Sequence, residues 1–196
     1  MLRIIAGQFR GRKLETPPQT ITRPTTDRVR ESLFNLLTSR LASEGMSYEY
    51  LHVLDAFAGS GALGIEALSR GAKHLTCFEQ NPKAYGILKY NLQNLFPSAT
   101  SEPDNAPPIT YHRLDATKPP KTETPADLIF LDPPYGKNLI PITLGSMLRK
   151  GWIDDKTLVL CEMGAEESLP ERFESFLLDQ RVYGTIKVEI YQGFKA

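Results

Sequence analysis

The stretch LHVLDAFAGSGALG, at residues 51–64, decides the fold. Its first half is a short apolar run, which predicts a buried strand over residues 51–57. Its second half has glycines at positions 59, 61 and 64. This is the G-x-G-x-x-G spacing of a loop that turns from a strand into a helix and lets a ligand approach the backbone. The stretch therefore predicts a strand, a glycine loop and a helix that ends at about Arg70.

The alternation of strand and helix continues along the chain. Four more apolar strands are expected, at 73–78, 109–114, 126–131 and 157–161. This pattern predicts an α/β fold with an open, doubly wound, mostly parallel Rossmann-like sheet. Ligands bind to such a sheet beyond the carboxyl ends of its strands. Acids stand at four of the predicted ends: Asp55, Glu79, Asp115 and Asp132.

The glycine loop and these acids together favour one kind of ligand. Glu79 comes twenty residues after Gly59, where an acid binds ribose hydroxyls. Asp55 precedes the loop, where it would repel a pyrophosphate but could meet an ammonium group. A nicotinamide dehydrogenase shares the glycine spacing, but nothing nearby resembles a hydride-transfer site. S-adenosylmethionine has an adenosine end and an amino acid end, and Asp115 is then expected to accept from its adenine amino group.

The sequence Asp132-Pro133-Pro134-Tyr135 directly follows an apolar strand. A Pro-rich turn there has few backbone donors and a fixed shape, as a cleft requires. An exocyclic amine of a nucleobase is a poor nucleophile. The Asp132 carboxylate and the Pro133 carbonyl could accept its N–H bonds while the Tyr135 ring stacks on the base. A strand that ends in a Pro-rich turn with a capping Asp explains these four residues equally well.

Length and composition limit the class of protein. With 196 residues, 41% of them apolar and 23% charged, the chain can bury one core. It has no run of eighteen apolar residues and no signal peptide is recognised, so a cytoplasmic protein without a membrane span is expected. Cys77 and Cys161 lie in apolar runs and are expected as buried thiols. His52, His74 and His112 have no ligand spacing, so no metal site is expected.

Charge is unevenly distributed along the chain. Lys and Arg balance Asp and Glu at 23 each, yet residues 1–30 hold seven basic and two acidic residues, a net charge of +5. A basic segment on a neutral protein favours local contact with a polyanion. The predicted RNA contacts are Phe9, Arg10, Arg12, Lys13, Arg23, Arg28 and Arg30. The alternatives are solvated arginines and a Phe9 that packs against the body of the protein.

Smaller elements flank the predicted core. A basic hairpin is expected over 2–15, followed by a helix capped by Thr26, with Arg28 and Arg30 near the mouth of the site. A terminal antiparallel hairpin is expected over 173–178 and 185–191. We expect one domain over 1–196, in which the hairpin and helix of 1–48 are appended to a cofactor-binding core of 49–196. The Pro-rich stretches 97–108 and 117–125 are expected as surface loops.

Five segments of the sequence carry a family resemblance: RIIAG at 3–7, GRKL at 11–14, RPTTDRVRE at 23–31, FAGSGALGIEALSRGA at 57–72, and DPPY at 132–135. In these the chain resembles the RsmD family of bacterial class I methyltransferases. That family places a methyl group on a guanine N2 of small-subunit ribosomal RNA. The glycine loop and DPPY alone indicate only an amino-methyltransferase, whereas the N-terminal segments are specific. The two Pro-rich stretches look longer than the family needs.

The resemblance implies a class I methyltransferase sheet, with S-adenosylmethionine as the cofactor and transfer in line from its sulfonium without a metal. It implies a cofactor site made of Asp55, Phe57, Gly59, Ser60, Gly61, Glu79 and Asp115. For the target amine it implies a site made of Asp132, Pro133, Pro134 and Tyr135. The expected partner is small-subunit ribosomal RNA, naked or in an assembling particle, and the expected state is a monomer.

Three alternatives remain open from the sequence. A DNA adenine-N6 methyltransferase would share the site, but little chain is left for a target-recognition segment. A protein glutamine methyltransferase faces the same unreactive nitrogen, although the basic N-terminal segment favours RNA. A non-enzymatic RNA-binding module would not need four acids directed at one cleft.

Overall fold

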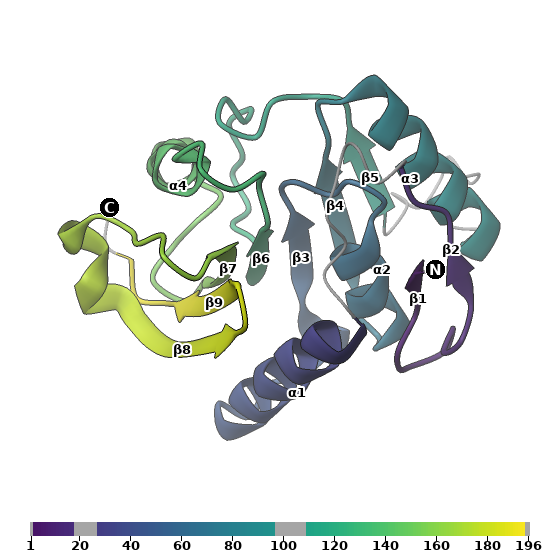
Figure 1. Ribbon diagram of the computed structural model, residues 1–196, viewed down its shortest axis with the longest axis horizontal. Helices are drawn as coiled ribbons and strands as arrows, with labels where there is room; N and C mark the ends of the chain where they lie inside the picture. Colours follow the sequence, from purple (N-terminus) through teal and green to yellow (C-terminus); the bar gives the residue numbers. More distant parts are fainter. Residues whose placement is uncertain (1, 18–26, 97–108, 195–196) are drawn as a thin grey trace.

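The computed structural model describes residues 2–17, 27–96 and 109–194, which form two sheets and four α-helices (Figure 1). The small sheet pairs β1 (Leu2–Arg3) with β2 (Lys13–Leu14). The large sheet contains β3 (His52–Asp55), β4 (His74–Phe78), β5 (Ile109–His112), β6 (Leu128–Leu131), β7 (Leu158–Gly164), β8 (Leu177–Tyr183) and β9 (Ile186–Tyr191). The helices are α1 (Asp27–Ser43), α2 (Ala62–Ser69), α3 (Pro82–Leu95) and α4 (Leu139–Lys150), with 3-10 turns η1 (Tyr48–Tyr50) and η3 (Glu171–Phe176).

The large sheet has the strand order β5-β4-β3-β6-β7-β9-β8. Neighbours from β5 to β7 are parallel, and β9 lies antiparallel between β7 and β8. The expected α/β fold class is therefore confirmed. The order reverses at β3, because the chain first moves outward to β4 and β5 and then returns to β6 on the other side. The loops after β3 and β6 consequently diverge and leave a crevice at the carboxyl ends of these strands.

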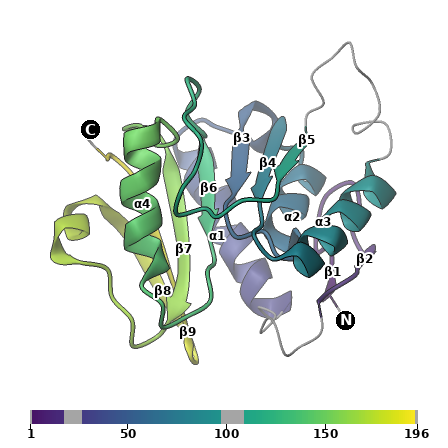
Figure 2. The same cartoon turned by 90° about the horizontal axis from the view of Figure 1, so that it is seen from above.

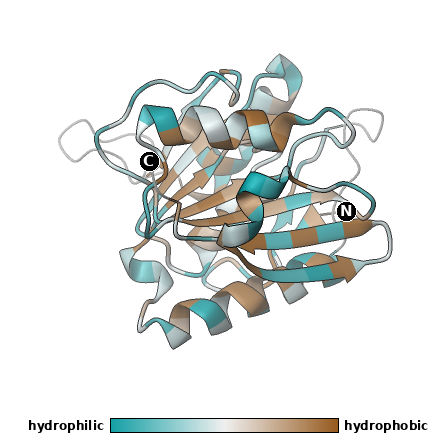
Figure 3. Ribbon diagram, turned by 90° about the vertical axis from the view of Figure 1, so that its left-hand side faces the viewer, coloured by the Kyte–Doolittle hydropathy of each residue, from teal (hydrophilic) through white to brown (hydrophobic). Residues whose placement is uncertain are grey.

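Alternate residues of the strands face opposite layers, as the β pleat requires. Val53 and Phe130 pack with α1, α2 and α3 in one buried cluster, whereas Leu54 and Ile129 pack with α4 in another. Figure 1 shows the strands between α1 on one side and α4 on the other. In the hydropathy colouring of Figure 3 the strands at the back are mainly brown, whereas the two at the front alternate between brown and teal. Both faces of the central strands are covered, which explains their continuous apolar runs.

Helix α1 runs alongside β9 from the carboxyl end of β7 toward its amino end. The Ser32 hydroxyl lies 2.7 Å from that of Tyr183, at the β8–β9 turn, which flanks the carboxyl end of β7. Toward the other end, Gln192 donates to Glu44 at 3.5 Å and to the carbonyl of Lys156, just before β7, at 3.0 Å. The first turn of α1 therefore lies at the same edge of the sheet as the crevice.

The tip of the N-terminal hairpin docks on the C-terminal end of α2. The amide of Gln8 donates to the Ser69 carbonyl at 2.7 Å, and the amide of Phe9 donates to Ser69 Oγ at 3.0 Å. The Phe9 ring packs edge-on against Phe96, directly after α3, with 4.7 Å between ring centroids. Helices α2 and α3 return from the crevice to the opposite edge of the sheet, so the hairpin tip lies at that opposite edge. Figure 2 shows β1 and β2 beside α2 and α3, away from β8 and β9.

The C-terminal hairpin differs from the expected one. Its first strand is β8, over Leu177–Tyr183, and not 173–178. Phe173 is instead buried in η3. The apolar residues around Phe173 suggested a strand there, whereas β8 is an edge strand with mostly exposed side chains and no hydrophobic alternation. The sequence signal therefore favoured the wrong segment.

The two Pro-rich stretches have different outcomes. The stretch at 117–125 is held to the body, because Trp152 Nε1 donates to the Pro120 carbonyl at 2.8 Å. The loop expected at 97–108 and the cap expected at Thr26 lie outside the described residues. Among the helices that are described, none has the length and apolar character to span a membrane.

Candidate active site

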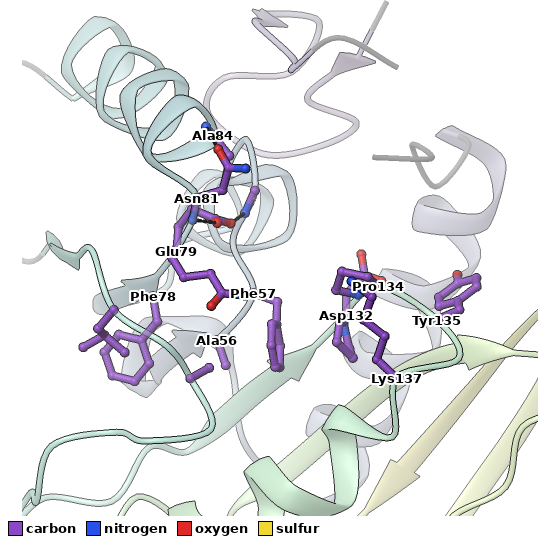
Figure 4. Close-up of a pocket in the computed structure, with 15 residues that line it drawn as sticks. Ala56, Phe57, Phe78, Glu79, Asn81, Ala84, Asp132, Pro134, Tyr135 and Lys137 are labelled. Carbon is purple, nitrogen blue, oxygen red and sulfur yellow. Dashed lines mark hydrogen bonds between the residues drawn. The ribbon is translucent and has the colours of Figure 1, made fainter. Parts of the chain in front are cut away.

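A cavity of about 500 Å³ opens in the crevice at the carboxyl ends of the central strands (Figure 4). One wall comes from the loop after β3 and from the segment that joins β4 to α3. The other wall comes from the loop after β6, and the segment after β5 closes one side. The lining residues are Ala56, Phe57, Gly59, Phe78, Glu79, Gln80, Asn81, Ala84, Leu114, Ala116, Asp132, Pro133, Pro134, Tyr135 and Lys137. The structure thus brings residues predicted for a cofactor and residues predicted for a target amine into one cavity.

Glu79 ties the glycine loop to the start of α3. Its Oε2 accepts from the amide of Gly59 at 2.8 Å, and its Oε1 accepts from the amide of Asn81 at 2.6 Å. A carboxylate oxygen can accept two hydrogen bonds, so each oxygen keeps the capacity to accept from a ligand hydroxyl. Glu79 is therefore both a support of the loop and a ribose-binding group of the right chemistry.

The glycines of the loop are required by its shape. Gly59 and Gly61 have φ values of 55° and 84°, which other residues rarely adopt. A Cβ on Gly61 would stand 2.6 Å from the Leu88 side chain and 2.9 Å from Ile65. Gly61 and Ser60 do not line the cavity themselves, and the Ser60 carbonyl accepts from Asn91 Nδ2 at 2.9 Å. Ser60 and Gly61 therefore pack the loop against α2 and α3, whereas Gly59 lines the cavity.

Asp55 lies beneath the glycine loop and does not line the cavity. It is 1% exposed, and its Oδ2 accepts from the amide of Gly64, in the first turn of α2, at 3.0 Å. Burial raises the pKa of this carboxyl to about 7, opposed by the Gly64 hydrogen bond and assisted by the charge of Glu79. The expectation that Asp55 meets a ligand directly is therefore replaced by a supporting role at the start of α2.

Apolar side chains line the end of the cavity that is expected to hold an adenine. Phe57, Phe78, Leu114 and Ala116 come from three different strand ends and suit the faces of an aromatic ring. Asp115 stands between two of these residues, but it does not line the cavity. Its Oδ1 accepts from the amide and the hydroxyl of Thr117, at 2.9 and 2.7 Å. Asp115 therefore fixes the turn that presents Leu114 and Ala116.

The loop after β6 forms the opposite wall. Figure 4 shows Asp132, Pro134 and Lys137 across the cavity from Glu79, with Phe57 between the two sides. Asp132 is half-buried. Burial raises its pKa well above the usual range for a carboxyl, and the charges of Glu162 and Asp55 raise it further. Asp132 consequently holds its proton to a higher pH than an exposed aspartate does.

Two glutamates hold the outer part of this loop. Tyr135 donates its hydroxyl to Glu162 Oε1 at 2.7 Å, and the amide of Gly136 donates to Glu167 Oε1 at 3.0 Å. The Tyr135 side chain remains about one-third exposed, whereas Glu162 is 1% exposed. The ring is thus held through its hydroxyl, and part of the residue remains open to solvent.

The predicted RNA contacts are separated by the fold. Arg28 is exposed on the first turn of α1, at the edge of the sheet where the cavity opens. Arg10 and Arg12 are exposed at the hairpin tip, at the opposite edge, and Lys13 is exposed in β2. Phe9 packs on Phe96, so the alternative that it packs against the body of the protein is confirmed. Arg23 lies outside the described residues.

The prediction that Arg30 contacts RNA is wrong. Its side chain is 1% exposed, and Nη2 donates to the Arg3 carbonyl at 2.6 Å and to Asp27 Oδ1 at 2.9 Å. Asp27 also accepts from Arg3 Nε at 3.0 Å. Arg30 therefore joins α1 to the N-terminal hairpin and is unable to reach a polyanion.

Several lining residues were missed from the sequence. Phe78, Leu114 and Ala116 each adjoin an acid that was recognised at a strand end, so their positions carried a usable signal. Lys137 comes two residues after Tyr135 and is a cation in the wall of the cavity. Across the parts of the chain that the structure covers, no cluster of three or more His, Cys, Asp or Glu could hold a metal ion.

Comparisons with known proteins cover nearly the whole chain. The sequence model of the family described as "Conserved hypothetical protein 95" matches residues 2–192. "Ribosomal RNA small subunit methyltransferase D" of Haemophilus influenzae is 37% identical over 197 residues, which cover 98% of this chain and 94% of that protein. The protein of the same name from Escherichia coli K12 is 36% identical over 192 residues, which cover 97% of this chain and 89% of that protein. The chain belongs to the RsmD family.

Solved structures agree with this membership. The yhhF protein of Escherichia coli has a TM-score of 0.75 and 34% identity, covering 98% of this chain and 97% of its own. HI0767 of Haemophilus influenzae has a TM-score of 0.73 and 32% identity, covering 99% of both chains. The RsmD family match extends from β1 through β9, so it includes both the basic hairpin and the antiparallel C-terminal strands.

Proposed function

We propose that this member of the RsmD family uses S-adenosylmethionine to methylate the exocyclic N2 amine of a guanine in small-subunit ribosomal RNA. One observation carries the proposal. A single cavity has the glycine loop and Glu79 on one side and Asp132 to Tyr135 on the other. A methyl donor and an amine must meet in such an arrangement, because transfer requires both within reach of each other.

The residues present suit the cofactor. Gly59 brings the backbone to the cavity wall, Glu79 keeps acceptor capacity for ribose hydroxyls, and Phe57, Phe78 and Leu114 offer apolar surface to an adenine. When bound, S-adenosylmethionine supplies a methyl group on a sulfonium, which is activated for transfer to a nucleophile. The chain itself needs only to hold this group with its methyl directed at the loop after β6.

The loop after β6 suits the acceptor. The lone pair of an exocyclic amine is delocalised into the base. Acceptors for its two N–H bonds draw the nitrogen toward a tetrahedral geometry and favour attack. In this chain the acceptors are the Asp132 carboxylate and the Pro133 carbonyl. The methylated nitrogen is strongly acidic, so its proton passes to Asp132 or to water without a strong base.

RNA reaches the cavity from the edge where α1 begins. The target guanine leaves its stack, because an amine inside a helix is unable to meet the methyl group in line. Tyr135 lines the cavity, is about one-third exposed and offers the base an aromatic surface. Arg28, on the first turn of α1, is an exposed cation suited to hold a phosphate of the flanking strand.

Nucleoside mass spectrometry tests this proposal. The purified protein is incubated with methyl-labelled S-adenosylmethionine and either naked small-subunit ribosomal RNA or small-subunit particles that lack the modification. Labelled N2-methylguanosine is the expected product. Label in DNA as N6-methyladenine, or in protein as methylglutamine, would overturn the proposed substrate. Absence of cofactor binding by calorimetry would overturn the enzyme itself and favour an RNA-binding module.

A further inference from the structure

We propose that Glu162 is a positioning residue for the target base, which it controls by holding the Tyr135 ring through the tyrosine hydroxyl. This inference rests on the proposed function and deepens it. It assigns a role to a buried acid that is absent from the lining of the cavity.

Glu162 lies at the hydroxyl end of the Tyr135 ring. Glu162 stands near the carboxyl end of β7, the strand next to β6, and it is 1% exposed. Tyr135 comes from the loop after β6 and reaches across to this strand end, where its hydroxyl lies 2.7 Å from Glu162 Oε1. A tyrosine held only by packing could rotate about its side-chain bonds. A hydrogen bond from a buried strand residue to the far end of the ring narrows the range of positions that the ring can take.

The chemistry of the partner favours a positioning role over a purely structural one. Burying a carboxylate costs free energy, and the cost is larger beside a second acid such as Asp132. A neutral or apolar side chain would fill this place at lower cost. A carboxylate, however, makes a charge-assisted hydrogen bond with a hydroxyl that is shorter and stronger than a neutral one. An acceptor at this place is therefore explained by the contact with Tyr135, and a neutral amide oxygen would keep about half of its strength.

The loop has a second anchor that does not fix the ring. Glu167 Oε1 accepts from the amide of Gly136 at 3.0 Å and from the amide of Gly164 at 3.3 Å. These are backbone contacts, so they set the path of the loop, whereas Glu162 Oε1 accepts from the hydroxyl at the end of the Tyr135 side chain. Loss of Glu162 should accordingly free the ring without unfolding the loop.

A double-mutant cycle tests the assignment. Tyr135→Phe removes the hydroxyl, Glu162→Ala removes its partner, and Glu162→Gln keeps an acceptor oxygen of the same shape. Each of the first two should lower kcat/KM for RNA by roughly 10-fold, about the effect of one hydrogen bond to a charged group. The kcat/KM of the double variant should be no lower than that of the less active single variant, because both substitutions remove the same contact. Glu162→Gln should retain activity within about 3-fold.

The matched control is Glu166→Gln, which removes one negative charge from an exposed residue just after β7. It should leave activity unchanged. Multiplying effects, near 100-fold in the double variant, would show that Glu162 and Tyr135 act separately and would overturn the proposal. If Glu162→Ala does not fold, Glu162→Gln replaces it in the cycle. The double variant with Glu162→Gln and Tyr135→Phe should then have the same kcat/KM as Tyr135→Phe alone.

The pH profile separates positioning from mere structural support. Asp132 faces two other acids, Glu162 from β7 and Asp55 from β3, and Lys137 lines the same cavity. Replacing Glu162 with Gln removes one of the charges that oppose ionisation of Asp132. The acid limb of the kcat/KM profile should therefore move to lower pH. An unmoved limb together with full activity of Glu162→Ala would mean that Glu162 only fills space.

One measurement does not depend on methylation. In the ligand-free protein, NMR relaxation of the Tyr135 ring signals should show faster ring motion in Glu162→Ala and motion near that of the parent in Glu162→Gln. A parent protein that methylates no RNA would sink the proposed function, while the ring motion would still decide whether Glu162 holds Tyr135. Equal ring motion in all three proteins would overturn the positioning role.

Discussion

The amide of Gly59 lies 2.8 Å from Glu79 Oε2, so the loop after β3 is held by the residue that follows β4. Glu79 also accepts from Asn81 at the start of α3. One side chain therefore sets the width of the cavity at the end expected to hold the ribose. A change at Glu79 should alter the glycine loop and the ligand contacts together.

Glu79→Gln should weaken S-adenosylmethionine binding by roughly 10-fold, the effect of about one hydrogen bond to a charged group. A glutamine has one acceptor oxygen, so either Gly59 or Asn81 loses its partner. Calorimetry measures the affinity, and Glu123→Gln, at an exposed position, is the control. Unchanged affinity in Glu79→Gln would remove Glu79 from the cofactor site.

Asp132→Asn should lower the rate on the order of 10²-fold, as loss of a positioned charge does, and leave cofactor affinity nearly unchanged. The asparagine keeps the shape of the side chain but not its charge. Single-turnover kinetics measures the rate. A full rate in Asp132→Asn would show that the charge of this side chain is not used.

The rate of the parent protein should rise with pH through the pKa of Asp132. The sign follows from the ionised form being the acceptor, and from a pKa that burial and then Glu162 raise above the usual range. The acid limb should therefore lie at higher pH than an exposed aspartate would give. A rate that is flat through the acidic range down to pH 4 would contradict this assignment.

Asp55 should make the protein less stable as pH rises from about 4 to about 7. Its folded-state pKa is raised to about 7, so in this window the folded state holds a proton that the unfolded state has lost. Stability from this group is fully present below the unfolded pKa and is lost through pH 7. Asp55→Asn should flatten the curve and stabilise the protein at pH 8. Urea unfolding at pH 5 and pH 8 measures both effects, and parallel curves for the two proteins would refute it.

The two basic regions should respond differently to RNA length. Arg28→Ala should reduce the salt dependence of binding by about 0.7–0.9 in log–log slope, even on a short RNA that carries the target guanine. Arg10→Ala with Arg12→Ala should change the slope only on long RNA or on particles, because these residues lie at the far edge of the sheet. Equal effects on the short RNA would mean that it reaches both edges. No effect on any RNA would make Arg10 and Arg12 solvated surface.

Much of the architecture followed from local patterns, because the central strands are buried on both faces and the helices have an apolar period. Burial of Arg30 could also have been predicted, since Arg30, Phe34, Leu37 and Leu41 share one helical face. The contact of Tyr135 with Glu162 could not, because it joins residues 27 apart through the pairing of β6 with β7. The turned side chain of Asp115 depends on Thr117 in the same way, on a contact that spacing alone does not specify.

Glu66 is fully buried in α2, and its two carboxylate oxygens accept from the amides of Ile5 and Ala6 at 2.7 and 3.0 Å. Arg70 pairs with the same carboxylate. Removing the first residues of the chain would leave this acid inside the protein without two of its donors, at a cost of several kcal/mol. The hairpin is consequently not a portable module. A chimera that exchanges the hairpin between relatives must also carry the matching face of α2. A truncation meant to abolish RNA binding would lower the stability of the protein, so a loss of binding would not by itself show that the hairpin contacts RNA.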